Sequence, residues 1–394
     1  MAVEIPQLAR TAIDLAHRNL IHTYLTSGEA KRDREIAHER ALRIMEVAQK
    51  YPIVMGLMNK MFTYNDPILK TSFAGLTTPN PLGVAAGFDK DARVYRFFGD
   101  AQGFGSVTDG SIARIDYGGN QRPRVYDLPH SRALDNRMGF PGQGSKKAAE
   151  RFSNDKKPRN FLLIVNFAAS KPSFERGTQI EDYRDVARDL VDFGDEGEMN
   201  VSSPNTPGVR GLQEPDVFSD LADAVFPVYI EYGKPVRPKF SPDLEDDKLY
   251  KNVRTTIDKK GSGITLTNTS TDPEIKALLS PLDIHREEPG GTSGAPITQK
   301  ALEMSHRLYE YIGEEIPIHR VGGIMNVRDG WDALTYGGAT TVDVFTSMVR
   351  KETSTPNFSY YFLRDLAKAM RANGMTGMKD FKELRGKKVP FPKI

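Results

Sequence analysis

The polar side chains of this sequence that could do chemistry recur directly after short apolar runs, where the strands of a parallel sheet would end. They are Lys90, Ser111, Asn166, Asn200, Ser202, Ser203, Lys239, Thr267, Asn268 and Thr269. Any one of them is more often a strand-end polar group with satisfied hydrogen bonds than a catalytic residue. In a barrel of parallel strands, however, the C-terminal strand ends meet on one face. We therefore expect the set to converge on a single site.

The chemistry of this set suits a flat, polar ring. Amide side chains place hydrogen-bond donors and acceptors in one plane, which matches a ring of alternating C=O and N–H groups such as a pyrimidine. The four asparagines available are Asn136, Asn200, Asn205 and Asn268. Lys90 and Lys239 add positive charge that would stabilise a carboxylate or a reduced, anionic flavin ring.

Two later segments predict a phosphate site. The sequence VGG at 321–323 and the sequence FTS at 345–347 each follow an apolar run. They expose backbone N–H groups and a hydroxyl, as the phosphate sites of such barrels do. A mononucleotide cofactor is the ligand that these segments indicate.

The elements that must position these residues are eight short runs of β-branched or apolar residues, most of them followed by a helix-like stretch. This alternation favours a closed α/β (β/α)₈ TIM barrel over an open sheet. The runs are 81–88, 104–111, 162–167, 197–203, 235–241, 263–270, 316–323 and 340–347. The long connection between the second and third runs contains RPRVYDLP at 122–129, which predicts an inserted strand or hairpin.

The N-terminal region is predicted to hold two amphipathic helices. Apolar residues recur at helical spacing from residue 5 to 26 and again from 36 to 48, and Pro52 stops the second pattern. A short apolar tail follows at 53–62. The helices either cap the barrel or lie as a hairpin on a membrane surface.

Composition excludes several classes of function. The 394 residues carry 54 basic and 52 acidic side chains, so the basic excess that a nucleic-acid binder needs is absent. The sequence contains no cysteine, which excludes disulfides, cysteine metal sites and a thiolate base. We expect no metal site. The first residues lack the features of a signal or transit peptide, and no apolar run approaches the length of a membrane span.

Several motifs, in order, resemble those of the dihydroorotate dehydrogenase family. They are NPLGVAAGFDKD (80–91), GNQRPRV (119–125), DNRMGF (135–140), NVSSPNTPGVRGLQ (200–213), KFSPDL (239–244), TNTS (267–270), GGTSG (290–294) and VGGI (321–324). Ser203 stands where class 2, the membrane-associated quinone-using branch, has serine and class 1 has cysteine. The N-terminal helices also resemble the class 2 extension, which forms a membrane-facing tunnel for quinone.

The resemblance implies a complete set of site residues. For flavin mononucleotide (FMN) they are Ala85, Ala86, Gly87, Lys90, Ser111, Asn166, Asn200, Lys239, Thr267, Ser293, Gly294, Gly322, Gly323, Phe345 and Thr346. For dihydroorotate they are Lys90, Asn136, Gly139, Phe140, Asn200, Asn205, Asn268 and Thr269. Ser203 and Lys90 are the implied catalytic residues, with Ser203 taking the C5 proton while hydride passes from C6 to flavin N5. The loop 204–213 resembles a lid over the substrate.

Four positions depart from the family pattern. Asp127 replaces an arginine that lines the quinone site, Phe345 replaces a common tyrosine, 167–170 differs near the flavin, and Pro141 replaces an asparagine. The substrate contacts are unaffected. A carboxylate cannot donate to a quinone carbonyl unless it is protonated or another donor takes its place. We expect weakened quinone binding that Asp127→Arg improves.

The sequence therefore predicts a helical segment at 1–62 for membrane docking and acceptor access, and an FMN-binding catalytic barrel at 63–394. Its product would be orotate for pyrimidine biosynthesis, its acceptor a quinone, and its place the cytoplasmic face of a bacterial-type cell membrane, or otherwise the cytoplasm. One alternative is an FMN barrel that acts on another pyrimidine-like substrate or uses a non-quinone acceptor. The other is a catalytically silent flavin or phosphate-binding barrel that serves as an interaction protein.

Overall fold

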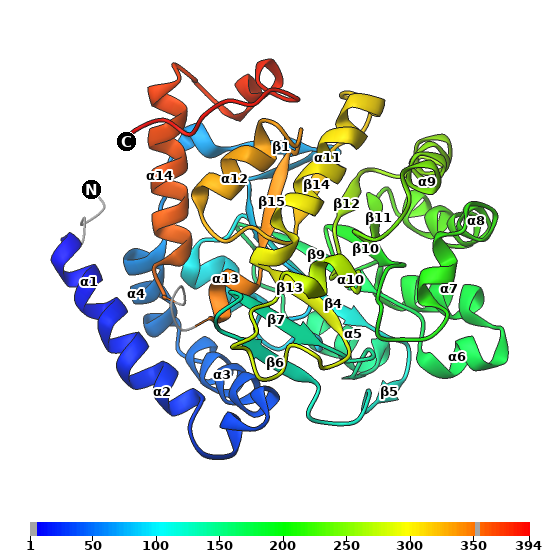
Figure 1. Ribbon diagram of the computed structural model, residues 1–394, viewed down its shortest axis with the longest axis horizontal. Helices are drawn as coiled ribbons and strands as arrows, with labels where there is room; N and C mark the ends of the chain where they lie inside the picture. Colours follow the sequence, from blue (N-terminus) through cyan, green and yellow to red (C-terminus); the bar gives the residue numbers. More distant parts are fainter. Residues whose placement is uncertain (1–5, 351–354) are drawn as a thin grey trace.

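Eight parallel strands close into a barrel in this structure, a computed structural model that describes residues 6–350 and 355–394 (Figure 1). Each strand pairs with its neighbours in chain order, and the last pairs with the first. The strands are β3 (Leu82–Val84), β4 (Ser106–Ile112), β9 (Leu162–Phe167), β10 (Glu196–Asn200), β11 (Val236–Phe240), β12 (Ile264–Leu266), β14 (Ile318–Val321) and β15 (Thr341–Val344). Every one overlaps a run predicted as a strand, so the (β/α)₈ barrel is confirmed.

Helices follow the strands and bury an apolar stripe beneath them. In α7, the buried residues Tyr183, Val186, Ala187 and Leu190 are spaced three and four apart, which places them on one face. The helices that follow β4 and the later barrel strands are α5 (Ser145–Asn154), α6 (Lys171–Arg176), α7 (Gln179–Leu190), α8 (Pro215–Glu231), α9 (Asp246–Asp258), α10 (Pro273–Ala277), α11 (Thr298–Ile312), α12 (Val327–Leu334), α13 (Thr346–Val349) and α14 (Phe358–Ala372). Short 3₁₀ turns lie at Pro67–Leu69, Val209–Gln213, Ala295–Ile297 and Met378–Glu383, and a π-helical turn lies at Phe97–Ala101.

A small antiparallel sheet stands beside the mouth of the barrel. It consists of β6 (Val125–Leu128), β7 (Ala133–Asn136) and β13 (Gly291–Gly294), with β7 in the middle. The inserted strand predicted within 122–129 is therefore confirmed. Two further antiparallel pairs are β1 (Thr71–Phe73) with β2 (Leu76–Thr78), and β5 (Asp116–Tyr117) with β8 (Gly142–Gln143).

The N-terminal region forms three helical segments where the sequence pattern predicted two. The first comprises α1 (Gln7–Ala16), a π-helical turn (His17–Ile21) and α2 (His22–Leu25), and the second, α3 (Arg34–Gln49), follows a 3₁₀ turn at Gly28–Lys31. Residues 53–62, expected as an apolar tail, instead form α4 (Pro52–Phe62). Pro52 ends the α3 pattern as predicted, but it also begins α4, because proline at the first helical position loses no intrahelical hydrogen bond.

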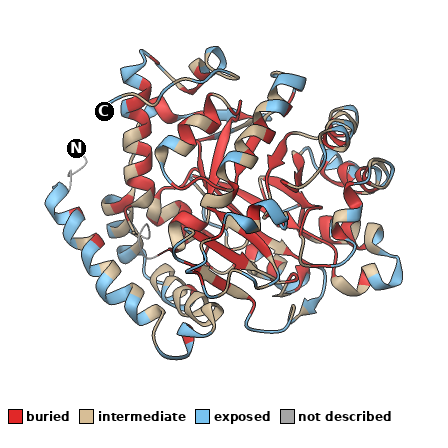
Figure 2. Cartoon of the chain, viewed as in Figure 1, coloured by how far each residue is buried: buried red, intermediate tan, exposed pale blue. Residues whose placement is uncertain are grey.

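Helix α1 buries two polar residues while several of its apolar residues stay exposed, and much of this helix is coloured as exposed in Figure 2. Arg10 and Asp14 are its buried residues, whereas Leu8 and Leu15 are 85% and 60% exposed. Asp14 accepts hydrogen bonds from Asn357 Nδ2 at 2.7 Å and from Tyr361 Oη at 2.9 Å, both beside or within α14. Buried polar groups need such partners. A polar clamp, formed by Arg10 and Asp14 with the residues they bind, therefore holds α1 against the barrel domain.

We expect Asp14→Ala to loosen α1 without unfolding the barrel, because it leaves the Asn357 amide and the Tyr361 hydroxyl without their buried acceptor. Losing hydrogen bonds to a charged group costs roughly 1.5–3 kcal/mol. Hydrogen exchange of the α1 backbone amides measures the effect, and the exposed Glu29→Ala serves as the control. Equal protection of α1 in both variants would show that the clamp does not hold it.

Candidate active site

A cavity of about 750 Å³ opens at the C-terminal ends of the barrel strands and extends between the N-terminal helices. Twenty of the residues predicted for the site line it. They are Ala85, Ala86, Gly87, Lys90, Ser111, Asn136, Gly139, Phe140, Asn200, Ser203, Asn205, Lys239, Thr267, Asn268, Thr269, Ser293, Gly322, Gly323, Phe345 and Thr346. Residues far apart in the sequence thus meet in one space, as the closure of a parallel barrel requires.

Two predicted residues, Asn166 and Gly294, lie just outside the cavity lining. Asn166 is fully buried on β9, where its Nδ2 donates to Glu198 Oε1 at 2.6 Å. Its Oδ1 has no hydrogen-bond partner among the described residues. At Gly294, a Cβ would lie 2.5 Å from the Arg132 carbonyl oxygen. Backbone contact therefore demands glycine at 294, next to the cavity-lining Ser293.

The predicted asparagines form two hydrogen-bonded pairs. Asn205 Nδ2 donates to Asn136 Oδ1 at 3.0 Å, and Asn268 Nδ2 donates to Asn200 Oδ1 at 3.2 Å. Asn200 Nδ2 in turn donates to Ser111 Oγ at 2.8 Å. These bonds fix the orientation of the amide planes, and a preorganised set of donors and acceptors suits a flat ring.

Ser203 and Lys90 approach the same cavity from β10 and β3. Ser203 is 7% exposed, and its Oγ accepts a hydrogen bond from the Asn205 backbone N–H at 3.3 Å. Lys90 Nζ donates to the Gly87 carbonyl at 2.5 Å. Burial lowers the pKa of Lys90, and the carboxylate of Glu35 on α3 opposes that shift. The site therefore places a hydroxyl and an ammonium group against one buried space.

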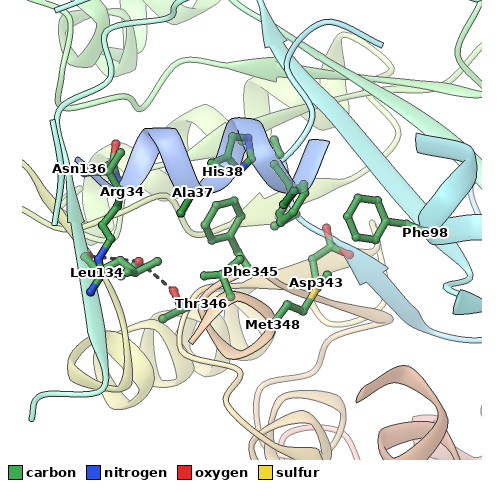
Figure 3. A pocket seen from close by; sticks show the side chains of 18 of the residues that line it. Arg34, Ala37, His38, Phe98, Leu134, Asn136, Asp343, Phe345, Thr346 and Met348 are labelled. Atoms are coloured by element: carbon green, nitrogen blue, oxygen red, sulfur yellow. Dashed lines mark hydrogen bonds between the residues drawn. The ribbon is translucent and has the colours of Figure 1, made fainter. Parts of the chain in front are cut away.

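Hydroxyl groups and glycines meet at the side of the cavity predicted to bind phosphate. Ser293 Oγ and Thr346 Oγ1 lie 2.9 Å apart, and Phe345 and Thr346 lie together in the close view (Figure 3). Gly323 has a φ of +76°, and a Cβ there would lie 2.4 Å from Thr298 Cα. Only glycine allows the chain to pass this closely, as expected where backbone forms the wall of a ligand site.

The N-terminal helices supply the apolar half of the cavity. Ala37, Ala41, Met45 and Met58 line it, and Figure 3 shows α3 running across the pocket. His38, also on α3, packs edge-on against Phe88 with ring centroids 4.8 Å apart. Burial, followed by the charge of Lys90, lowers the pKa of His38 to about 3, so this imidazole is neutral.

Sequence reasoning did not single out His38 or its neighbour Arg34 as site residues. Both line the cavity, and they are four residues apart on α3. That spacing places them on one helix face together with Ala37 and Ala41. The sequence signal that could have identified them was a pair of polar residues on the apolar face of an N-terminal helix.

Asp127, which replaces the arginine expected at the acceptor site, is paired with two guanidinium groups. Arg34 Nη2 lies 3.4 Å from one carboxylate oxygen and Arg350 Nη1 lies 3.3 Å from the other. Arg350 is buried and also donates to the carbonyls of Leu128 and Pro129 at 3.2 and 3.0 Å. Arg34 and Asp127 both line the cavity. A cation therefore reaches this wall from α3 rather than from position 127.

The donor set fits a flat ring system carrying a phosphate. Asn166 Oδ1 and Thr269 Oγ1 are buried atoms without partners among the described residues, so they can serve a ligand. Among the same residues, no group of three or more histidine, aspartate or glutamate side chains could hold a metal ion.

Comparisons with known proteins agree with this geometry. Residues 68–358 match the family model described as Dihydroorotate dehydrogenase. A relative from Helicobacter acinonychis called Dihydroorotate dehydrogenase (quinone) is 31% identical over 352 residues, covering 88% of this chain and 94% of the relative. One of the same name from Erythrobacter litoralis is 35% identical over 321 residues, covering 80% and 88%.

A solved structure shares the fold across nearly the whole chain. Ligand-free DHODH from Eimeria tenella superposes with a TM-score of 0.78 at 26% identity, covering 89% of this chain and 98% of that one. The family match, the two curated relatives and the site geometry lead to one conclusion. This chain belongs to the dihydroorotate dehydrogenase family, flavin-dependent enzymes that oxidise dihydroorotate in pyrimidine biosynthesis.

Proposed function

We propose that this enzyme binds FMN and dihydroorotate in the cavity above the barrel and passes electrons to a quinone that enters between the N-terminal helices. The observation that carries the proposal is the continuity of the cavity. One space joins the asparagine pairs and Ser203 at the barrel mouth to an apolar region lined by α1, α3 and α4. Such a space suits a polar substrate at one end and an apolar acceptor at the other.

FMN, when bound, supplies the hydride acceptor. The residues that would hold its ring and ribityl chain are Ala85, Ala86, Gly87, Lys90, Ser111, Asn166, Asn200, Lys239 and Thr267. The residues that would hold its phosphate are Ser293, Gly294, Gly322, Gly323, Phe345 and Thr346. Two observations support this assignment. Asn166 Oδ1 has no hydrogen-bond partner among the described residues, and position 323 must be glycine because a Cβ there would collide with the backbone of Thr298.

The substrate would lie among Asn136, Asn200, Asn205, Asn268 and Thr269, with Gly139 and Phe140 beside it. Lys90 would pair with its carboxylate, which favours dihydroorotate over an uncharged pyrimidine such as dihydrouracil. Four amides that are already oriented by hydrogen bonds reduce the entropy lost when the ring binds. The positions of the side chains thus support a carboxylated pyrimidine.

Ser203 would act as the base. Its Oγ takes the C5 proton of dihydroorotate while its own hydroxyl proton passes to solvent, the hydride leaves C6, and the C5=C6 double bond of orotate forms. The Asn205 backbone N–H, which already donates to Ser203 Oγ, would orient that oxygen and stabilise the alkoxide character that it gains as its own proton leaves. Arg210, whose Nη1 donates to Thr271 Oγ1 at 2.7 Å, holds the loop 204–213 over the site, which limits water entry.

Replacing Ser203 with alanine should slow flavin reduction by dihydroorotate about a hundredfold, the typical contribution of a positioned base, while FMN stays bound. Anaerobic bleaching of the flavin absorbance in a stopped-flow instrument measures the rate. Ser203→Cys should recover part of the rate with a pH profile moved to lower pH, because a thiol has a lower pKa than a hydroxyl. Wild-type bleaching rates in the alanine variant would remove Ser203 from the mechanism.

Arg34 would orient the quinone by donating to one of its carbonyl oxygens. A guanidinium at the wall of an apolar passage is well placed for this. Asp127 lies 3.4 Å from one of its nitrogens, and a guanidinium has several N–H donors, so others remain for the quinone. This arrangement changes the expectation for Asp127→Arg. The substitution would bring a third guanidinium beside Arg34 and Arg350, so it should weaken quinone binding.

Arg34→Met should raise the KM for a soluble quinone roughly tenfold or more, which is the loss expected for a hydrogen bond to a charged group. Reduction of the flavin by dihydroorotate should be unchanged, because Arg34 is proposed to act only on the acceptor. Steady-state quinone assays and anaerobic bleaching separate the two half-reactions. The exposed Arg32→Met is the control, and an equal KM in both variants would exclude Arg34.

The outward faces of the N-terminal helices support peripheral attachment to a membrane, which we propose is the cytoplasmic face of a bacterial-type cell membrane. Leu8, Ile53 and Leu57 are 85%, 80% and 55% exposed, and Tyr24 is also exposed. No described helix is both long and apolar enough to cross a bilayer. An apolar surface without a spanning segment is typical of interfacial helices.

Combined Leu8→Gln, Ile53→Gln and Leu57→Gln substitutions should abolish cosedimentation with phospholipid vesicles, since each removes apolar surface from the proposed interface. Flavin reduction by dihydroorotate should persist. Leu282→Gln with Ile284→Gln is a matched control, because these residues are 67% and 90% exposed in the segment after α10. Undiminished cosedimentation of the triple variant would show that this face is not the membrane-binding surface.

A further inference from the structure

The interior of the barrel holds a buried ionic network directly beneath the cavity. Glu196 and Glu198, two residues apart on β10, point the same way, as alternate residues of a strand do. Both contact Arg237 on β11, with Glu198 Oε2 lying 3.4 Å from Arg237 Nε. All three side chains are no more than 1% exposed. Such groups replace the branched apolar residues that usually fill a barrel of this kind.

Stability alone does not account for this network. Removing charges from water is expensive, and replacing a buried ion pair by well-packed apolar residues is often neutral or stabilising. The network therefore calls for a second role, and the contacts of its members show a difference between the two glutamates.

Glu198 contacts two of the side chains proposed to hold the flavin ring, Asn166 beside the cavity and Lys239 in its lining. Its Oε1 accepts from Asn166 Nδ2 at 2.6 Å and lies 3.9 Å from Lys239 Nζ. Its Oε2 accepts from Thr265 Oγ1 at 2.6 Å. One carboxylate thus holds an amide and an ammonium group together while Thr265 and Arg237 fix the carboxylate itself.

The orientation of Asn166 follows from this contact. Since its Nδ2 is committed to Glu198, its Oδ1 is the end left available, and that buried atom has no partner among the described residues. Lys239, which lines the cavity, is held at the same carboxylate. An acceptor and a cation are therefore presented side by side, which suits the N–H and carbonyl groups at the edge of a flavin ring.

Glu198 also differs from Glu196 in its ionisation. Burial alone would raise the pKa of Glu198, but Lys239, Arg237 and the hydrogen bonds from Thr265 and Asn166 outweigh it, and the pKa lies below its ordinary value. For Glu196, burial prevails over Arg237 and the pKa is raised. The charged form is thus favoured at the glutamate nearer the cavity, by the same side chains that this carboxylate contacts.

We propose that Glu198 is a positioning residue for the flavin, which fixes Asn166 and Lys239 in the geometry that binds the ring. The inference rests on the proposed flavin site and adds a residue that touches neither flavin nor substrate. Glu196 provides a matched control. It shares the strand, the burial and the partner Arg237, but its other hydrogen bond comes from Ser262 Oγ, at 3.3 Å. Among the described residues, no hydrogen bond or ion pair joins it to Asn166 or Lys239.

The test compares Glu198→Gln with Glu196→Gln. FMN is titrated into each apoenzyme, the dissociation constant is taken from the quenching of flavin fluorescence, and the absorption spectrum of the bound flavin is recorded. We expect Glu198→Gln to weaken FMN binding about tenfold and to shift the spectrum, as the loss of charged hydrogen bonds to its two partners requires. Glu196→Gln should change FMN affinity less than about twofold.

A third comparison separates positioning from a general loss of stability. In a Lys239→Met, Asn166→Ala background, Glu198→Gln should weaken FMN binding no further, because the residues through which it acts are gone. If Glu198→Gln does not fold, Thr265→Val replaces it, since it removes the hydroxyl that orients the carboxylate and should act in the same direction.

The outcomes are distinct. Equal FMN dissociation constants for the two glutamine variants, or a full additional loss in the double-substituted background, would overturn the role of Glu198 while leaving the proposed function intact. A wild-type chain that binds no flavin would instead overturn the proposed function.

Discussion

Closure of eight parallel strands is the constraint on which the rest of the molecule depends. A closed barrel has no open sheet edge, and because its strands are parallel they all end on the same rim. Asn200 on β10 and Lys239 on β11 are neighbours in register, although 39 residues separate them in the chain. The asparagine pairs and the Glu198 contacts exist only because this register holds. The barrel strands thus position the site residues, and the connecting segments form the walls of the cavity.

The barrel was predictable because its signal is local and repeated. Each strand is a short apolar run with a polar end, and buried parallel strands such as β9 need no alternation of apolar and polar residues to be recognised. Many of the site residues were predictable for a related reason, since they lie within those runs or follow them directly. Gly139, Phe140, Ser293 and Gly294 do not, and only the family resemblance indicated them. Only Asn166 and Gly294 fell outside the cavity lining, and both contact residues adjacent to it.

The features that sequence reasoning missed depend on contacts between distant segments. Pattern analysis treats a buried charge as an exposed one, so it could not place Arg10 and Asp14 on the inner face of α1 or Arg237 inside the barrel. In both cases the partner that makes burial tolerable lies far away in the sequence: Asn357 for Asp14, and Glu196 for Arg237. Helix α4 was missed for a local reason, because proline stops one helix and can also begin the next.

Charged side chains are stabilised in different ways at the two ends of the cavity. At the barrel end, Glu198 is deeply buried and keeps its charge because Lys239 and Arg237 face it from β11. At the acceptor end, Asp127 and Arg34 are each about one third exposed or less, and water shares in stabilising them. Partly solvated pairs contribute little to stability and can rearrange at small cost, whereas a buried pair keeps its geometry. Rigid charges therefore lie at the proposed flavin position, where a ring must be held in one orientation, and adaptable charges lie at the proposed acceptor entrance.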